Sequence, residues 1–379
     1  MIELIDQSEQ SIYNYAAPID FEEVATEYLF VDLVQTAAFR RLRGIRFLGG
    51  IDYLLVPAPN GASSNVRYTR YQHSLGVARL ALHYANLTGL SNQNRRLAYV
   101  AALLHDIGHA PLSHSLEPIF EAEFGLNHHI ATEDIIAGRV KIGQGVYQTL
   151  RRFGIDPDQI IAILAGEADP FQGFFSGPIN FDTIEGILRS RRYVMSNTVG
   201  PTPIDVVNAA IQRKTEIDRQ IVDSFWKCKD DVYNFVIKSR DGALVDHLCQ
   251  YVMRGNLEKL SRRDFLSTER YLFRKIPELR LVLAISRLRS ASREALSRPV
   301  AYKARHFYVD THADFFAWDD ERRYRQNKQD RLLSAPASMS SAIDEEEWDL
   351  FHGGSVRARQ TTFGRKASGT PMRPRGRRS

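Results

Sequence analysis

The chain has very little cysteine, no long apolar run and no apolar leader. Its 379 residues include two cysteines, Cys228 and Cys249, which do not form a CxxC pair. Two cysteines cannot cross-link a chain of this size, so the sequence predicts a cytoplasmic protein in which thiolates hold no metal. No apolar run reaches the roughly 18 residues that a membrane span needs. The opening MIELIDQSEQSIYNY has no basic segment followed by an apolar one, and no signal peptide is expected.

Acidic residues are absent from the last part of the chain. Residues 353–379 carry eight Lys or Arg and no acid; because the whole chain has a net charge of +5, the remainder carries −3. The segment is rich in Gly, Ser, Pro and Arg and cannot bury enough apolar surface to offset its ordering entropy. We therefore expect a disordered basic tail, which either keeps the protein in solution or contacts nucleic acid electrostatically.

Helical periodicity dominates the rest of the sequence. Apolar residues make up 44% of the chain, and in RRLAYVAALLHD the residues Leu97, Val100, Ala101 and Leu104 recur at the spacing of one helix face. The stretch DLVQTAAFRRLRGIRFLGG also predicts a helix, which its two final glycines would end. Strand-like stretches such as IDYLLVP are few and short. The sequence therefore predicts an all-α protein, a helical bundle with few short strands.

The same patterns divide the chain into four parts. An N-terminal segment covers residues 1–30, and a core that holds most of the histidines covers residues 31–200. Residues 201–322 are predicted to form the helical C-terminal part of the body. From about residue 323 the periodicity dissolves, so residues 323–379 are expected to be largely disordered and basic at the end.

Seven of the eleven histidines lie between residues 73 and 129. His105 and Asp106 end an apolar helix, where a buried aspartate faces the negative end of the helix dipole. A bound cation would offset both the unfavourable helix dipole and the burial of the negative charge. The alternative is that the two residues form an exposed polar helix cap, which needs no cation. His73 and Asp182 stand at the starts of two other predicted helices. Two imidazoles and two carboxylates suit Mn²⁺, Mg²⁺, Fe or Zn²⁺, with positions left for water and substrate.

Five stretches between about residues 33 and 192 resemble, in order, motifs of the HD-domain phosphohydrolases. The resemblance is to their dNTP triphosphohydrolase branch, which includes the bacterial dGTPases and the eukaryotic SAM-and-HD-domain dNTPase. The stretches are AAFRRLRGIRFLGG, GAS…RYQHSLGVARLA, HDIGHAPLSHSLE, LNHHIATEDII and INFDTIEGILRS. The resemblance implies an almost all-helical HD domain over the 31–200 core. It also implies metal-dependent hydrolysis of dNTPs to deoxynucleoside and inorganic triphosphate.

The resemblance assigns roles to individual residues. It makes four of them ligands of a divalent metal: His73, His105, Asp106 and Asp182. It places four more in the catalytic group: His109, His114, Glu117 and His128. Within this group His114 would protonate the leaving 5′-oxygen and Glu117 would orient a histidine, while Arg70 matches an arginine that contacts substrate phosphate. His129 is expected to face solvent, and His83 is expected to be structural.

Departures from the family pattern fall in the last motif. Where this chain has Thr183, the family has Arg or Lys. Where it has Gly186, the family has a tyrosine that packs on the deoxyribose, and where it has Ser190, the family has an aspartate that binds the sugar 3′-hydroxyl. Loss of buried polar pairing weakens the discrimination expected for dNTPs. Three nearby arginines either contact phosphate instead or form a solvated helix face: Arg189, Arg191 and Arg192.

Three functions are compatible with these residues. The first is a dNTP triphosphohydrolase. The second is an HD-type phosphodiesterase or nuclease acting on oligonucleotides or a nucleotide signal, which the altered sugar site and the basic tail favour. The third, a non-catalytic nucleotide sensor, is disfavoured because no ligand or catalytic residue is missing. The resemblance also implies a homo-oligomer and a nucleotide effector, which Arg41 and Arg43 would help to bind; no membrane partner is expected.

Overall fold

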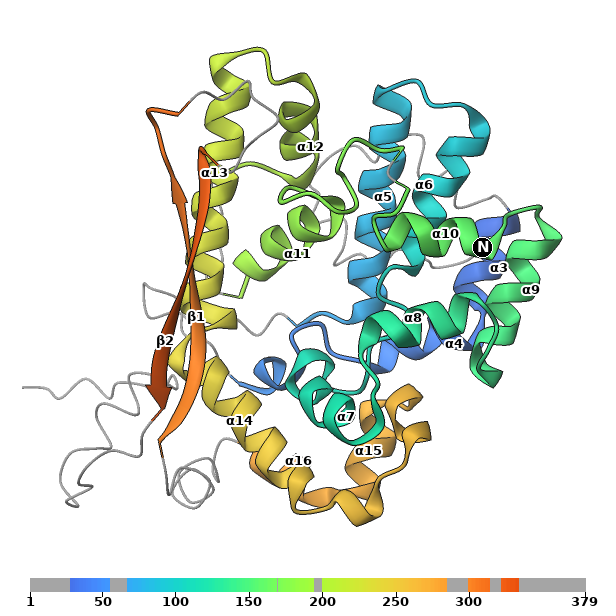
Figure 1. Ribbon diagram of the computed structural model, residues 1–379, viewed down its shortest axis with the longest axis vertical. Helices are drawn as coiled ribbons and strands as arrows, with labels where there is room; N and C mark the ends of the chain where they lie inside the picture. The colour runs from blue at the N-terminus through green and yellow to red at the C-terminus, as the bar shows by residue number, and fades with distance from the viewer. Residues whose placement is uncertain are drawn as a thin grey trace, which may run out of the picture.

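The computed structural model describes residues 28–54, 67–168, 170–193, 200–284, 299–313 and 322–333. Figure 1 shows these ranges as a group of helices with one pair of strands along an edge. The expectation of an all-α protein with few strands is confirmed. No helix among the described residues is long and apolar enough to cross a membrane. The expected basic tail, residues 353–379, lies outside the described residues, as do residues 1–27.

The described residues form α-helices along most of the chain. The first of them are α3 (Tyr28–Gln35), α4 (Ala37–Arg41), α5 (Arg70–Leu87), α6 (Asn92–Leu104), α7 (Glu117–Phe124), α8 (His128–Ile136), α9 (Gln144–Arg152) and α10 (Pro157–Leu164). They are followed by α11 (Phe181–Arg191), α12 (Pro203–Gln212), α13 (Glu216–Val232), α14 (Arg240–Arg254), α15 (Glu269–Lys275) and α16 (Pro277–Val282). A π-helical turn, Tyr233–Ile237, continues α13.

Polar N-caps fix where three important helices begin. Thr69 forms a capping box with Gln72 at the start of α5, Asn127 caps α8, and Asn180 caps α11. In each case a side-chain oxygen accepts a backbone N–H that the first helical turn leaves unpaired. The caps set the phase of each helix and therefore the direction in which the His and Asp side chains of its first turns point.

The single helix predicted over residues 32–50 is wrong. Thr36 interrupts it, because its hydroxyl donates to the carbonyl of Leu33 at 2.7 Å and accepts the N–H of Phe39. Threonine competes in this way with the backbone bonds of a helix. The chain continues as α4, and a β-bridge to Thr69 then ties the following turn to the start of α5.

The main hydrophobic core surrounds α5 and α6. All eight residues of α6 from Leu97 to Leu104 are buried, so this end of the helix is enclosed on every side. A helix that is apolar all round lies in the interior of a protein, and this one carries His105 and Asp106 inward with it. A second apolar cluster joins α7 to α14, α15 and α16.

The two strands β1 (Val300–Val309) and β2 (Tyr324–Leu333) form an antiparallel pair beside α13 (Figure 1). Trp226 of α13 contacts Phe307 of β1 and Tyr324 of β2, with ring centroids 5.5 and 5.2 Å apart. The expectation of disorder from residue 323 onward is therefore wrong for β2. The sequence of β2 shows no apolar alternation because its two ends, Tyr324 and Leu333, are buried while the residues between them are exposed.

Candidate metal centre

Four potential ligand atoms from three helices meet at one point. His73 lies one turn into α5, His105 and Asp106 follow α6, and Asp182 lies in the first turn of α11. Nε2 of His73 is 3.0 Å from Oδ1 of Asp182, 3.4 Å from Oδ2 of Asp106 and 3.3 Å from Nε2 of His105. Nε2 of His105 is 3.4 Å from Oδ2 of Asp106 and 3.8 Å from Oδ1 of Asp182. The structure thus brings together the four residues predicted to bind a metal.

Hydrogen bonds on the outer side of both rings leave their Nε2 atoms facing this point. Nδ1 of His73 is 2.5 Å from Oε2 of Glu185, and Nδ1 of His105 is 2.7 Å from the carbonyl oxygen of Ala102. A carboxylate and a carbonyl accept a hydrogen bond, so each Nδ1 donates, and each ring in its neutral form has its lone pair on Nε2. Two such lone pairs and two carboxylate oxygens at these distances form a donor set that fits a divalent cation.

The carboxylates make this point electronegative. Burial alone would raise the pKa of Asp106, but the charges of His105 and Arg70 outweigh burial and hold that pKa well below its usual value. Burial lowers the pKa of His105, but Asp106 and Asp182 raise it, to about 10. The two acids therefore attract positive charge, which is present either as protons on the imidazoles or as a bound cation.

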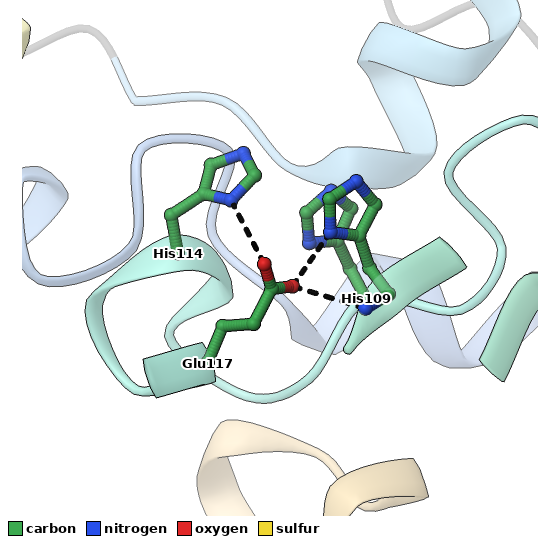
Figure 2. Close-up of side chains that lie close together, drawn as sticks. His109, His114 and Glu117 are labelled. Atoms are coloured by element: carbon green, nitrogen blue, oxygen red, sulfur yellow. Dashed lines mark hydrogen bonds and ion pairs between the residues drawn. The ribbon is translucent and has the colours of Figure 1, made fainter. Parts of the chain in front are cut away.

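A second group lies beside the first and consists of His109, His114, Glu117 and His128. Oε2 of Glu117 is 2.6 Å from Nδ1 of His128 and accepts the backbone N–H of the same residue at 3.1 Å, which fixes this ring at the start of α8. The rings of His109 and His128 stack 4.4 Å apart. Figure 2 shows the Glu117 carboxylate pointing between His114 and His109. Burial would raise the pKa of Glu117, but the His114 and His128 rings hold it well below its usual range.

The two groups are joined through Asp106. Its Oδ2 pairs with Nη1 of Arg70 at 2.6 Å, and its Oδ1 lies 3.1 Å from Nε2 of His109. His109 is fully buried, and burial together with the charge of Arg70 holds its pKa well below the usual value, so the ring is neutral. His114 differs from the others because its side chain is 60% exposed and open to a ligand.

The turn that carries His114 has a strained backbone. Leu112 and Ser113 have φ angles of 58° and 46°, in the left-handed region that costs a residue with a Cβ about 1–2 kcal/mol. Glu269 of α15 accepts the N–H of Leu112 at 3.3 Å, and the Ser113 hydroxyl donates to the carbonyl of Arg46 at 2.9 Å. Contacts from distant parts of the chain therefore hold the backbone before His114 in a conformation it would not adopt alone.

Glu185 and Arg189 lie on the inner face of α11 and support the metal centre. Oε2 of Glu185 holds His73, while its Oε1 accepts from Nε of Arg189 at 2.8 Å. Both Glu185 and Arg189 are 1% exposed. The two interpretations offered for Arg189, a solvated helix face or a phosphate contact, are therefore wrong. Opposite charges four residues apart are a readable sign of a helical ion pair, but the sequence does not reveal that this pair is buried beneath a histidine.

Arg41 is buried and not available to an effector. Its guanidinium donates to the carbonyl oxygens of Ile107, His109 and Ser267 at 2.7, 2.7 and 3.2 Å. Burial lowers the pKa of Arg41 to about 10, which leaves it charged at neutral pH. The expected contact between Arg41 and a regulatory nucleotide is therefore wrong, whereas Arg43 is exposed. Arg41 instead holds in place the loop that follows His105 and Asp106.

Several other candidate side chains lie outside both groups. Nε2 of His83 is 2.7 Å from Oδ1 of Asn208, which links α5 to α12, so His83 is structural as expected. His129 is exposed on α8, also as expected. Cys228 and Cys249 are buried and unpaired, and burial raises the pKa of Cys228 to about 11. Neither thiol belongs to a group that could hold a metal among the described residues.

A cavity of about 430 Å³ opens beside the metal centre. Metal-centre residues form one of its sides, and apolar and aromatic side chains form much of the rest: Val77, Ile136, Ile161, Leu164, Phe174, Phe175 and Phe181. This volume is within the range of small-molecule sites, about 300–1,000 Å³. None of the described residues that line it is Lys or Arg, so its walls suit an apolar or aromatic group better than a phosphate.

The positions where the sequence departs from the family pattern lie on α11. Ser190 is 1% exposed, and its hydroxyl has no hydrogen-bond partner among the described residues. Gly186 is half-buried; a Cβ added there would lie 3.5 Å from Cζ of Phe47 and 3.6 Å from Cε1 of His73. Thr183 follows Asp182 and is half-buried. This part of α11 therefore presents neither an aromatic ring nor a charged side chain where the family has them.

A comparison with protein families finds that residues 70–163 match the HD domain. The matched range contains His73, His105, Asp106 and the whole second group, while Asp182 lies beyond its end. It runs from the first residue of α5 to near the end of α10.

Curated relatives match a similar part of the chain. The uncharacterized protein MG461 homolog of Mycoplasma pneumoniae is 34% identical over 148 residues, which are 37% of this chain and 31% of that protein. The uncharacterized protein YwfO of Bacillus subtilis is 34% identical over 139 residues, 35% of this chain and 29% of that protein. The human deoxynucleoside triphosphate triphosphohydrolase SAMHD1 is 29% identical over 147 residues, 36% of this chain and 22% of that protein. The matches thus span less than a third of the length of these relatives.

Proposed function

On the premise that this chain contains an HD domain, we propose that it is a metal-dependent phosphohydrolase that cleaves dNTPs to deoxynucleoside and inorganic triphosphate. The observation that carries the proposal is the convergence of His73, His105, Asp106 and Asp182, with both Nε2 atoms facing two carboxylates. The similarity to a protein named as a deoxynucleoside triphosphate triphosphohydrolase supports the choice of substrate. The donor set suits Mn²⁺, Mg²⁺, Fe or Zn²⁺.

A divalent cation held by these residues would neutralise phosphate oxygens and acidify water at neutral pH. The surrounding side chains hold its ligands in place. Glu185 fixes the ring of His73, and Arg70 fixes Asp106 while also donating to the hydroxyl of Ser113 at 3.1 Å. Such supporting contacts orient the ligands of a metal and keep their lone pairs available. A contact between Arg70 and substrate phosphate stays a prediction.

Departure of the 5′-oxygen requires a proton, and His114 is the residue suited to supply it. Its ring is exposed, and its Nδ1 lies 3.8 Å from Oε1 of Glu117. Burial lowers the pKa of the His114 ring, and the ionised carboxylate of Glu117 opposes this shift by favouring the protonated imidazole. His128, whose ring stacks on that of the buried His109, would bind oxygens of the phosphate chain. The fixed backbone at Leu112 would keep the His114 ring directed toward the leaving group.

A second candidate function is an HD-type phosphodiesterase or nuclease that acts on oligonucleotides or a nucleotide signal. The observation in its favour is that Ser190 is buried and Gly186 has no side chain, so these two positions of α11 offer neither a carboxylate nor an aromatic ring to a deoxyribose. On this reading the apolar cavity receives a nucleobase of an oligonucleotide. A homo-oligomer, a nucleotide effector and nucleic-acid contact by the basic tail stay predictions for both candidates.

The test is product analysis with the full-length protein. Each dNTP, alone and mixed, is incubated with Mn²⁺ and either wild type or Asp106→Ala, and the products are separated by anion exchange. The proposal expects deoxynucleoside and inorganic triphosphate from wild type and neither from the variant. Cleavage of oligonucleotides with no turnover of dNTPs would transfer the assignment to the second candidate. No metal-dependent hydrolysis of either substrate would reject both.

A further inference from the structure

Two cations without a carboxylate partner among the described residues lie on α13, which packs against α11, and on β1, which packs against α13. Lys229 is on α13 and Arg305 is on β1, and neither forms an ion pair with an acid among the described residues. The nearby Asp230 is occupied elsewhere, because it accepts the backbone N–H of Phe307 at 2.8 Å. Both cations lie within residues 201–322, where the sequence contains no recognised motif.

The environment of Lys229 is unfavourable for a charge. Its side chain is 8% exposed, and its Nζ lies 4.5 Å from the ring centre of Trp226 and 4.8 Å from that of Phe307. Among the described residues this ammonium makes one hydrogen bond, a long one of 3.5 Å to the carbonyl of Pro178. An ammonium has three donors, and a buried charge is costly unless it is paired. Aromatic faces offset part of that cost but do not replace an anion.

The charges around Lys229 indicate where a partner would sit. Burial lowers the pKa of Lys229 to about 8; the charge of Asp182 opposes this shift, and the charge of Arg305 adds to it. The guanidinium of Arg305 lies 5.8 Å from the ring centre of Tyr233, one turn after Lys229. The two cations therefore repel each other, and the Asp182 carboxylate, whose side chain is 57% exposed, attracts Lys229.

The contact with Pro178 connects Lys229 to the metal centre. Pro178 lies two residues before Asn180, the N-cap of the helix that carries Asp182. At the residue after Asp182, where the resembling family has Arg or Lys, this chain has the uncharged Thr183. The apolar cavity on the other side of the centre has no Lys or Arg among its described lining residues. A negatively charged group at the metal centre is therefore attracted toward α13 and β1, and away from that cavity.

We propose that Lys229 and Arg305 form an anion subsite that binds a phosphate of the substrate held at the metal centre. This inference rests on the proposed function, because it takes the ligand to be a phosphate chain. Lys229 acts as a buried point charge and Arg305 as a planar donor, the two ways in which proteins bind phosphate. The subsite fixes the orientation of the substrate: its phosphates lie toward α13 and β1, and its apolar part lies in the cavity.

The test is calorimetric titration of inorganic triphosphate into full-length protein stripped of metal with EDTA and dialysed. The variant is Lys229→Met, which replaces an unpaired buried charge with an apolar side chain of similar length and therefore does not threaten folding. The matched control is Lys227→Met, two residues earlier on α13 and exposed. Circular dichroism verifies that both variants are folded.

The inference expects saturable binding to wild type and Lys227→Met, and at least a tenfold weaker affinity for Lys229→Met. Equal affinity of all three proteins for triphosphate, or no binding to any of them, would overturn it. The outcome is separable from that of the proposed function, because no metal and no hydrolysis are involved. Triphosphate binding that depends on Lys229 in a protein that hydrolyses no dNTP would keep the subsite and reject the proposed reaction.

Discussion

Glu185 connects His73 to Arg189: one carboxylate oxygen lies 2.5 Å from Nδ1 of His73, and the other accepts from Nε of Arg189 at 2.8 Å. All three side chains are buried. The carboxylate fixes the proton of His73 on Nδ1 and so leaves Nε2 free to face Asp106 and Asp182. The geometry of the metal centre therefore depends on a residue that is not itself one of the predicted ligands.

Replacing this carboxylate should weaken metal binding. We expect Glu185→Gln to lower the affinity for Mn²⁺ by about 10–100-fold, the usual effect of losing such a supporting contact. The variant should also be less stable, by about 3–5 kcal/mol, because Arg189 is left buried without its charge partner. Isothermal titration of metal-stripped protein measures the affinity, and urea unfolding measures the stability. An unchanged Mn²⁺ affinity in the folded variant would contradict this role.

Removing the buried charge of Lys229 should stabilise the protein at neutral pH. Its pKa falls from 10.5 to about 8 on folding, so the unfolded chain binds more protons between these values and the stability of wild type rises with pH across that window. We expect Lys229→Met to be more stable by about 2 kcal/mol at pH 7, after allowance for the lost aromatic contact. The advantage should shrink as pH rises from about 8 to about 10.5. Urea unfolding at several pH values measures it, and a pH-independent difference would contradict the explanation.

The loop after Asp106 should depend on Arg41. Two buried carbonyl groups, of Ile107 and His109, and the partly buried one of Ser267 lose their donor in Arg41→Ala, and each unsatisfied buried group costs about 1–3 kcal/mol. We expect a fall of at least about 3 kcal/mol in the free energy of unfolding, together with reduced hydrolysis. Arg43→Ala is the matched control, because Arg43 is exposed and rests on the Tyr71 ring at 4.4 Å; its cost should stay within about 1 kcal/mol. Comparable losses in the two variants would argue against a specific role for Arg41.

Gly186 should tolerate a methyl group. It lies inside α11, where glycine costs about 0.5–1 kcal/mol relative to alanine, and an added Cβ would make ordinary contacts at 3.5 Å or more. We expect Gly186→Ala to raise the urea midpoint. Gly108→Ala is the contrasting variant, because its Cβ would lie 2.3 Å from the backbone N of Thr132 and 2.4 Å from the carbonyl of His128. Destabilisation by Gly186→Ala would show that the space at this position is smaller than the structure indicates.

Local patterns at predicted helix ends singled out the metal-centre residues, and the resemblance to the HD-domain phosphohydrolases assigned them as ligands. The sequence did not predict the supporting contacts. Arg41 bonds to residues 66 and 68 positions later, and Glu269 accepts from Arg46 and from Leu112, 223 and 157 positions away. No local pattern reports such pairings. The sequence of β2 was misread for a related reason: its burial at Tyr324 and Leu333 depends on packing against distant residues.

The most direct test of the central claim is Mn²⁺ binding by Asp182→Ala. The Asp182 side chain is 57% exposed, so its removal does not threaten the fold. Asp158→Ala is the matched control, because Asp158 is also in the first turn of a helix and exposed. Isothermal titration should give one Mn²⁺ site per chain in wild type and in Asp158→Ala, and a severe loss of affinity in Asp182→Ala. Wild-type affinity in Asp182→Ala would contradict a metal centre at this point.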